Sequence, residues 1–446
     1  MKAKSFTERN LHDHHPLNLI RYPQSVESRF DERGAPRDIS NRSIIEALVY
    51  RSMHSSQPGS LVDHYFKLYG MEVSGSNLSE RRRGMDEAVF DEILSTTLKP
   101  LGEPGRDVDS FYQGMRLLGI DGSSFSLRNA PDLQMHLERH NCGGKGLSGF
   151  FKVQFSALVE LGTHCPIALE CDVLEQECES NLSYRLYKKI PDNSLLCLDQ
   201  LYGRKRTLYE IHQFLKDKNN AHFLVRWDER QNYEICEELA DGSTLIKFCV
   251  RKNSSPNPNQ IVGELQLRMF EYEVRVNGKN EKFVLVTDLL DEQLYPMHEL
   301  KNLFRRRWEQ EIYYYELKVI LAKNRPLKDK TIQTVYQEIV ALTLASFITA
   351  SKRLEVTGRD KAPAQPLRIS YRKTIDIVCQ FWTVIEMSRE VLDDPLIEQL
   401  IEKMNQSIAR CIIPPRRKRS CPRVAHNPKA GKWGKPKIND DNLPSF

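Results

Sequence analysis

The chain of 446 residues lacks the sequence features of a secreted, disulfide-bonded or membrane-spanning protein. Its ten cysteines show neither the paired spacing of a disulfide framework nor a Cys-x2-Cys zinc pattern, so we expect reduced thiols. The start of the chain holds no apolar stretch, and we expect no secretory signal. The most apolar segment, residues 335–350, is interrupted by Gln337 and Glu338 and is too short to span a bilayer. These absences predict a cytoplasmic protein with no membrane partner.

The chain also has little net charge, except in one segment. The net charge is +5, from 65 basic and 60 acidic residues. Residues 410–437 contain ten Lys or Arg and no acid, so the remainder has 55 basic residues against 60 acidic ones. A dense basic tail attracts polyanions, of which nucleic acid is the commonest for a cytosolic chain. A solubilising tail without a specific target is the alternative.

The N-terminal region carries helix signals. Helix-start patterns precede apolar-periodic runs at residues 41–49, 60–69 and 74–93, and the last run contains Arg81 and Arg82. Three short helices with an arginine-rich last member fit a helix-turn-helix-like unit. A helical domain whose arginines are simply solvated fits the same pattern.

Strand signals follow the helical region. Apolar or alternating runs at residues 115–121, 150–161, 166–173 and 194–199 predict strands, and residues 182–190 predict a helix. Strands that alternate with helices after an initial meander indicate an α/β fold with a sheet of mixed direction.

A second group of strand signals lies between residues 222 and 290. Turn residues separate these strands, and Asn277-Gly278 predicts a hairpin turn. The pattern indicates a β-rich insertion in the α/β domain. A helical stretch then begins at Met297 and runs to about residue 323, with further helices to about residue 407.

Two aspartates close short apolar runs. Asp121 ends the run at 115–121, and Asp199 ends the run at 194–199. Such positions place a carboxylate at a sheet edge, where the chain leaves the core and a ligand can enter. A single aspartate after a strand is more often a turn or a helix cap. The pair therefore indicates a site only if a third acid joins it.

The helix predicted after Met297 supplies a third acid. At 100° per residue, Phe304, Arg307, Glu311 and Lys318 fall within a stripe of about 60°. A stripe with an aromatic ring, two cations and an acid is unlike a core face. Taken alone, Arg307 and Glu311 are an ordinary surface ion pair one turn apart.

The spacing of these four residues resembles a known signature. The run Phe304-x2-Arg307-x3-Glu311-x6-Lys318 is similar to the Tyr-x2-Arg-x3-Glu-x6-Lys signature of the insertion-sequence-four family of DDE transposases. Phenylalanine replaces the tyrosine and lacks a hydroxyl group that could bond a phosphate. We therefore expect reduced or altered binding of DNA ends before any loss of chemistry.

The resemblance extends over most of the chain. Residues 118–124, 196–202 and 285–311 resemble the family's segments around its two aspartates and before its glutamate. In the second segment, Gln200 and Leu201 replace the family's arginine and glycine. These replacements leave the three acids intact and weaken a position that contacts DNA.

The resemblance implies a fold and a chemistry. It implies an RNase H-like mixed-sheet catalytic domain in which Asp121, Asp199 and Glu311 are the catalytic residues and hold two Mg²⁺ ions, with Mn²⁺ as a substitute. Two such ions activate an oxygen nucleophile and stabilise the leaving oxygen when a phosphodiester breaks. In the family, hydrolysis frees a 3′-hydroxyl that forms a hairpin end, and the same 3′-end later attacks target DNA.

The resemblance also implies partners and contacts. The implied partner is double-stranded DNA, as transposon ends and as target, bound by a homodimer in a synaptic complex near the nucleoid. Phe283 stands about where the family has an aromatic that stacks on a flipped base, although a core position is the alternative. For the arginines outside the signature, a solvated face is the alternative. The expected DNA-binding residues are Phe304, Arg307, Lys318, Arg81, Arg82, Arg204 and Phe283.

Six segments make up the expected organisation. They are a helical N-terminal DNA-binding domain (1–105), the first part of the catalytic core (106–220), a β-rich insertion (221–296), the second part of the core with the Glu311 helix (297–330), a helical C-terminal region (331–410) and a basic tail (411–446). The predicted function is that of a transposase that binds terminal inverted repeats and cuts and joins DNA. A catalytically silent DNA-binding regulator derived from a transposase, and an RNase H-like nuclease, are the alternatives.

Overall fold

The structure is a computed structural model that describes residues 16–27, 39–54, 59–139, 147–173, 178–251, 260–276, 279–359, 362–388 and 391–414. Within these ranges, no helix is both long and apolar enough to cross a membrane. The cysteines in the same ranges carry free thiols. The basic tail predicted for residues 411–446 lies outside the described residues from residue 415 onward.

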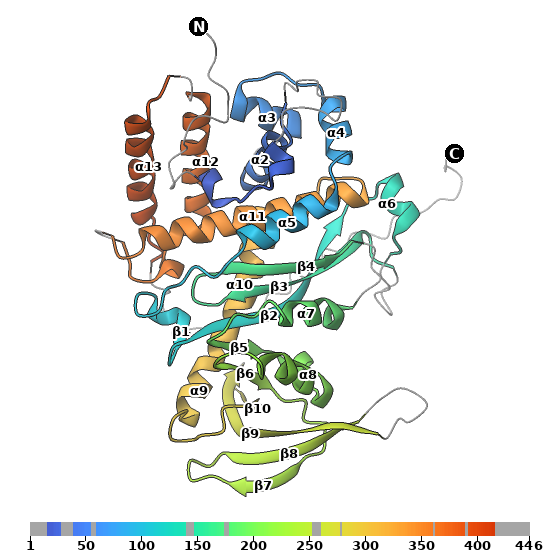
Figure 1. The fold of residues 1–446 in the computed structure, drawn as a ribbon, viewed down its shortest axis with the longest axis vertical. Helices are drawn as coiled ribbons and strands as arrows, with labels where there is room; N and C mark the ends of the chain where they lie inside the picture. The colour runs from blue at the N-terminus through green and yellow to red at the C-terminus, as the bar shows by residue number, and fades with distance from the viewer. Residues whose placement is uncertain are drawn as a thin grey trace.

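A ten-stranded mixed sheet runs from the middle of the molecule, where β2, β3 and β4 lie, to the lower end of the view in Figure 1, where β7 and β8 lie. The order of its strands is β4-β3-β2-β5-β6-β10-β9-β8-β7, with β1 paired to β2. The strands are β1 (Phe111–Tyr112), β2 (Met115–Leu127), β3 (Phe151–Glu160), β4 (Cys165–Asp172), β5 (Ser194–Leu198), β6 (Ala221–Arg226), β7 (Glu234–Glu238), β8 (Thr244–Arg251), β9 (Ile261–Val276) and β10 (Lys279–Thr287).

Helices flank this sheet, so the predicted α/β class with a mixed-direction sheet between helical regions is confirmed. The helices are α1 (Gln24–Glu27), α2 (Asn41–Met53), α3 (Leu61–Tyr69), α4 (Gly75–Arg83), α5 (Glu87–Thr97), α6 (Pro131–His136), α7 (Glu179–Tyr187), α8 (Lys205–Leu215), α9 (Met297–Phe304), α10 (Trp308–Tyr315), α11 (Ile332–Val356), α12 (Tyr371–Met387) and α13 (Asp394–Ala409).

The central strand β5 is parallel to both of its neighbours, β2 and β6. Strands β3 and β4 continue the sheet from β2 in antiparallel pairs. All five residues of β5 are buried, as expected for a short apolar strand that helices cover on both faces. Helices α7 and α8 pack on one face with Leu196, and α9 packs on the other face with Cys197.

The strands after β6 extend the same sheet. Strand β10 pairs antiparallel with β6, so β7 to β10 continue the sheet from this edge instead of forming a separate layer. Strand β6 starts at residue 221, where we placed the beginning of the insertion, and it pairs with β5. Strand β7 is an exposed, acid-rich edge strand that gave no sequence signal. The predicted hairpin turn at Asn277-Gly278 lies outside the described residues.

Helices from both ends of the chain form one layer. Ile44 on α2, Ile348 on α11 and Trp382 on α12 belong to a single buried hydrophobic cluster. The ring of Tyr50 meets Trp382 edge-on, with centroids 5.6 Å apart. The N-terminal and C-terminal helical regions, which we predicted as separate segments, therefore share one core. Helix α11 lies between this layer and the sheet (Figure 1).

The helix predicted from Met297 to about residue 323 is not uniform. Helix α9 ends at Phe304, a 3-10 turn (η5, Arg305–Arg307) follows, α10 runs next, and a π-helical segment (η6, Glu316–Leu321) ends the stretch. Because hydrogen bonds join residues three apart in a 3-10 turn and five apart in a π turn, a fixed rotation of 100° per residue does not describe this stretch. The stripe of Phe304, Arg307, Glu311 and Lys318 assumed a straight α-helix, and that assumption is wrong.

Candidate active site

Asp121 lies on β2, and Asp199 directly follows the neighbouring parallel strand β5 at the matching position. Strands β2 and β5 pair up to Gly119 opposite Cys197, and two residues further along each strand comes an aspartate. Because side chains alternate along a strand, both carboxylates leave the sheet on the same face as Gly119 and Cys197. Neighbouring strands lie about 4.8 Å apart, so the two acids meet at the end of this parallel pair.

The two aspartates differ in how their strands end. Strand β2 does not stop at Asp121, as the apolar run suggested, but continues to Leu127, because β3 keeps pairing with it. Asp199 follows the last residue of β5, and its Oδ1 accepts a hydrogen bond of 2.8 Å from the backbone N–H of Leu201. It therefore caps the short 3-10 helix η4 (Gln200–Tyr202) as well as facing Asp121.

Helix α10 is held directly over the first of these strands. The packing is close, since a methyl group on Gly119 would lie 2.8 Å from Oε1 of Gln310. Nε2 of Gln310 donates 3.3 Å to the carbonyl of Ala157 on β3, and the Tyr314 hydroxyl donates to the carbonyl of Asp121. These contacts fix the first turn of α10, which carries Glu311 with a side chain 44% exposed.

The carboxylates interact electrostatically. Burial, followed by the charges of Asp199, Glu179 and Glu311, raises the pKa of Asp121 to about 7. A carboxyl group in a half-buried position beside other acids holds its proton because like charges repel in a medium of low dielectric constant. Asp121 thus lies within electrostatic range of the two other predicted acids, Asp199 and Glu311, and of a fourth acid, Glu179.

Glu179 is the acid that the sequence analysis missed. It opens α7, and its Oε1 accepts hydrogen bonds from the backbone N–H of Gly122 at 3.1 Å and from the Tyr202 hydroxyl at 3.2 Å. A side chain on Gly122 would overlap its carboxylate, so glycine is needed beside it. Burial raises the pKa of Glu179, and Asp199 adds to the rise. No spacing pattern marks Glu179, because it comes from a helix on the opposite face of the sheet.

Two cations of the signature lie near the acids. Nζ of Lys318, in η6, donates 3.0 Å to Oγ of Ser123, two residues beyond Asp121 on β2. Nη1 of Arg307 lies 3.7 Å from Oε1 of Glu311, and the Arg307 side chain is 19% exposed. Both positive groups therefore border the acidic cluster from the helix side.

The two aromatic rings that we predicted to contact DNA pack against other residues of the protein. Phe304 is 8% exposed and packs in a hydrophobic cluster with Leu195 and Leu285. The guanidinium of Arg226 lies over the ring of Phe283 at 3.8 Å from its centroid. Burial of Phe304 favours a packing role, and the DNA contacts of both rings stay predictions.

The arginines outside the signature differ in accessibility. Arg82 is buried and donates to Asp329 through both terminal nitrogens at 3.0 and 2.8 Å. Arg81 donates to the carbonyl of Ile39 and, at 2.8 Å, to Oδ1 of Asn41. Arg204 keeps a side chain that is 61% exposed. The inward contacts of Arg81 and Arg82 favour a role in helix packing, whereas Arg204 faces solvent.

The donor set suits a hard divalent cation. Carboxylate oxygens are the ligands that Mg²⁺ prefers, and a cation among these acids would remove the repulsion that raises the pKa of Asp121. Among the described residues, no three acidic, histidine or cysteine side chains already stand at metal-binding distance from one another.

The strand order β4-β3-β2-β5-β6, with acids at the end of its central parallel pair and a third acid on the covering helix, defines the class of the protein as RNase H-like α/β. A model of the transposase DDE domain matches residues 112–348. Because this match covers more than half of the chain, the protein belongs to the transposase DDE domain family.

Two relatives from Escherichia coli (strain K12) agree with this assignment. The chain is 22% identical over 312 residues to transposase InsG for insertion sequence element IS4. The aligned region covers 70% of this chain and 67% of InsG. It is 24% identical over 155 residues to the candidate transposase InsZ, which covers 35% of this chain and 50% of InsZ. The chain is thus similar to an IS4 transposase, and DDE transposase domains generally use divalent metals.

Proposed function

We propose that this protein is a Mg²⁺-dependent transposase that binds the terminal inverted repeats of an insertion sequence and catalyses strand cleavage and strand transfer. The observation that carries the proposal is the register of β2 with β5, which aligns Asp121 with Asp199 beneath the helix of Glu311. Membership of the transposase DDE domain family supports it.

In this proposal, Asp121, Asp199 and Glu311 hold two Mg²⁺ ions through carboxylate oxygens, and Mn²⁺ substitutes. Bound there, the ions would supply an activated oxygen nucleophile and would stabilise the leaving oxygen. The protein's own part is to hold the acids on rigid strand ends and on a helix fixed by Tyr314. Lys318 and Arg307 border the acids and hold the phosphates that flank the scissile bond.

The test compares cleavage and joining of duplex DNA that carries the ends of the element by wild type, Asp121→Asn and Asp217→Asn. Asp217 is an exposed acid after α8 and serves as the matched control. We expect wild type and Asp217→Asn to cut and join DNA in Mg²⁺. We expect Asp121→Asn to bind the same DNA and lose cleavage by on the order of a thousandfold or more.

Each alternative function has its own outcome. Cleavage without joined products would indicate an RNase H-like nuclease. Binding of the correct ends without cleavage by wild type would indicate a catalytically silent regulator. Equal cleavage by wild type and Asp121→Asn would remove Asp121 from the reaction, and a complex with one protein chain per pair of ends would contradict the homodimer proposed for synapsis.

A further inference from the structure

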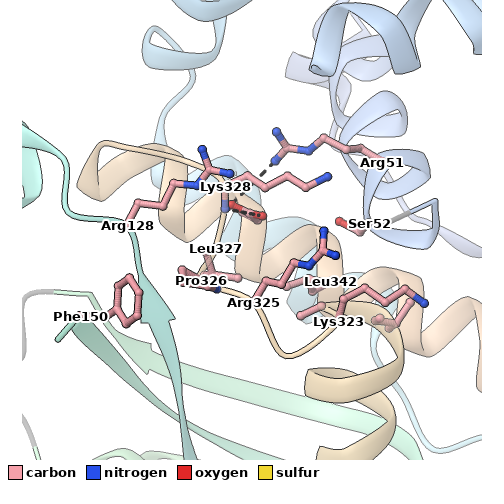
Figure 2. A pocket seen from close by; sticks show the side chains of 13 residues that line it. Arg51, Ser52, Arg128, Phe150, Lys323, Arg325, Pro326, Leu327, Lys328 and Leu342 are labelled. Atoms are coloured by element: carbon pink, nitrogen blue, oxygen red, sulfur yellow. Dashed lines mark hydrogen bonds and ion pairs between the residues drawn. The ribbon is translucent and has the colours of Figure 1, made fainter. Parts of the chain in front are cut away.

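A cationic cavity lies apart from the acidic cluster (Figure 2). It has a volume of about 350 Å³ and lies between the end of α2, the end of β2, the segment that follows η6, and α11. Arg51 comes from α2, Arg128 follows β2, and Lys323, Arg325 and Lys328 come from the segment after η6. Five positive side chains from three parts of the chain therefore face one space, and none of the five belongs to the signature.

The positive charge of this cavity is largely uncompensated. Among the described residues that line it, Glu338 is the one acid, and its oxygens accept from the backbone N–H groups of Lys328 at 3.1 Å and Asp329 at 2.9 Å. Arg51 is held by Asp329 at 2.8 Å.

The other four cations are the ones that a ligand can reach. In the described part of the chain, the side chains of Arg128, Lys323, Arg325 and Lys328 make no hydrogen bond or ion pair. Burial is the main cause that lowers the pKa of Lys328. The charge of Arg51 adds to this fall, as expected where cations crowd, and Glu338 and Asp329 oppose it. An anion in the cavity would relieve this crowding.

An unusual backbone presents two of the cations. Lys323 and Asn324 are successive non-glycine residues in the left-handed region, with φ of 58° and 51°, a conformation that costs about 1–2 kcal/mol per residue. The N–H of Asn324 bonds the carbonyl of Lys318 at 2.7 Å, and the N–H of Leu327 bonds the carbonyl of Ser126 at 2.8 Å. The strained turn is thus tied to η6 and to β2, which keeps Lys323 and Arg325 at the cavity.

The cavity is connected to the candidate active site by β2. Asp121 and Arg128 are seven residues apart along one extended segment, roughly 23 Å at about 3.3 Å per residue. Each duplex strand carries one phosphate per about 3.4 Å of axis, so about seven base-pair steps cover that distance. Lys318, in contact with Ser123, lies between the two places.

We propose that this cavity is a phosphate subsite that grips the DNA backbone on one side of the cleavage point. The proposal rests on the proposed function in that it takes DNA as the substrate of the neighbouring acids. The ligand is a backbone phosphodiester, recognised by charge and not by base sequence. The subsite would set the position of the duplex relative to Asp121 without taking part in the reaction.

The test uses the full chain and a fluorescein-labelled duplex of random sequence without divalent metal, so that binding is measured without cleavage. The double variant Lys323→Gln/Arg325→Gln removes two cations from the cavity. The control Lys216→Gln/Lys403→Gln removes two exposed lysines, one after α8 and one on α13. Anisotropy titrations at a series of salt concentrations give the affinity and its salt dependence.

We expect the cavity variant to bind DNA about tenfold more weakly and the slope of log affinity against log salt to fall by about 1 for each phosphate that the protein no longer neutralises. The control should match wild type in both quantities. A single neutral methylphosphonate, moved along the duplex of an end-bound complex, should weaken wild type at one position and leave the cavity variant unchanged there.

Three results would overturn the proposal. One is equal affinity and slope for wild type and the cavity variant. Another is an equal methylphosphonate effect in both proteins. The third is a cavity variant that loses the binding of inorganic phosphate but binds DNA as well as wild type does, which would indicate a small-anion site. If the double variant unfolds at a lower temperature, Arg128→Gln, at an exposed residue on another wall, repeats the measurement.

Failure of this proposal can be told from failure of the proposed function. If wild type does not cut DNA but the cavity variant binds it more weakly, the subsite stands and the enzyme assignment fails. If wild type cuts and joins DNA while the cavity variant binds and cuts equally well, the subsite alone fails.

Discussion

At the scale of single residues, Asp121 is the group whose ionisation the fold changes most clearly within the acidic cluster. An aspartate in an unfolded chain has a pKa of about 3.9, whereas burial and then Asp199, Glu179 and Glu311 raise the pKa of folded Asp121 to about 7. Between these values the folded chain binds more protons than the unfolded chain. The contribution of Asp121 to stability therefore falls as the pH rises from about 4 to about 7.

This loss of stability with rising pH leads to a prediction for the Asp121→Asn variant in EDTA. At pH 8 we expect the variant to unfold at a higher temperature than wild type, by roughly 2–4 °C for each kcal/mol of repulsion removed. The difference should become small near pH 4, where the carboxyl is protonated in the folded state and about half protonated in the unfolded state. Glu179→Gln should give part of the same gain, because it removes one of the repelling charges. Thermal melts between pH 4 and pH 8 check this prediction. Equal melting temperatures of wild type and Asp121→Asn at pH 8 would contradict the clustering of the acids around Asp121.

Added Mg²⁺ should reverse the order of stability. A divalent cation that binds only the folded acids stabilises wild type by mass action, and Asp121→Asn lacks one of the ligands. We expect the melting temperature of wild type to rise with Mg²⁺ concentration and that of Asp121→Asn to stay nearly constant. A parallel rise in both proteins would mean that the ion binds elsewhere.

At the scale of secondary structure elements, a buried cluster of charges holds the junction of α10 with η6. His164, at the turn between β3 and β4, lies 2.8 Å from Glu316 through Nδ1 and 3.1 Å from Glu309 through Nε2. Arg353 on α11 lies 3.2 Å from Glu316. Burial alone would lower the pKa of His164, but the two glutamates outweigh it and the pKa is raised. The helix of Glu311 is thereby fixed to the sheet and to α11.

Removal of this histidine should loosen the junction. His164→Asn suits the positive φ of 58° at this position. It removes the histidine contact of Glu309 and leaves Glu316 paired with Arg353 alone, so we expect a loss of about 1–3 kcal/mol. The raised pKa of His164 means that its contribution is fully present below about pH 6.5 and is lost as the pH rises through its folded pKa. Chemical denaturation at pH 6 and pH 9 should show the larger loss at pH 6. His136→Asn, at an exposed position, is the control, and equal losses at both pH values would contradict this role.

At the scale of the whole molecule, Asp329 joins the N-terminal helices to the segment before α11. Its carboxylate accepts from Arg51 on α2 at 3.3 and 2.8 Å and from Arg82 on α4 at 3.0 and 2.8 Å. Burial would raise the pKa of Asp329, but Arg51 and Arg82 hold it far below its usual range. N-terminal helices and the segment before α11 are therefore one structural unit.

We expect Asp329→Ala to destabilise this unit by about 3–5 kcal/mol, because it leaves two buried guanidinium groups without their carboxylate. The N-terminal helices should then become sensitive to proteolysis before the sheet does. Limited proteolysis followed by mass spectrometry checks the order of cleavage. Glu80→Ala, at an exposed position on α4, should change neither stability nor cleavage order, and simultaneous digestion of helices and sheet in Asp329→Ala would contradict the arrangement.

The sequence by itself determined the elements and the two aspartates. Short apolar runs predicted the strands that lead to Asp121 and Asp199, helix-start residues such as Ser60 predicted the N-terminal helices, and the spacing around Glu311 indicated the family. Such features are local, because periodicity and capping act over a few residues. Local patterns did not show the 3-10 and π turns that lie on either side of α10.

Only the tertiary structure decided which distant residues meet. It brought Glu179 to Asp121 from the opposite face of the sheet, turned Arg82 inward to Asp329, and collected the cations around Lys323 into one cavity. These residues are far apart along the chain, so no period in the sequence records that they meet. Strand register and helix packing fix such pairs, because both depend on how the whole chain buries its apolar surface.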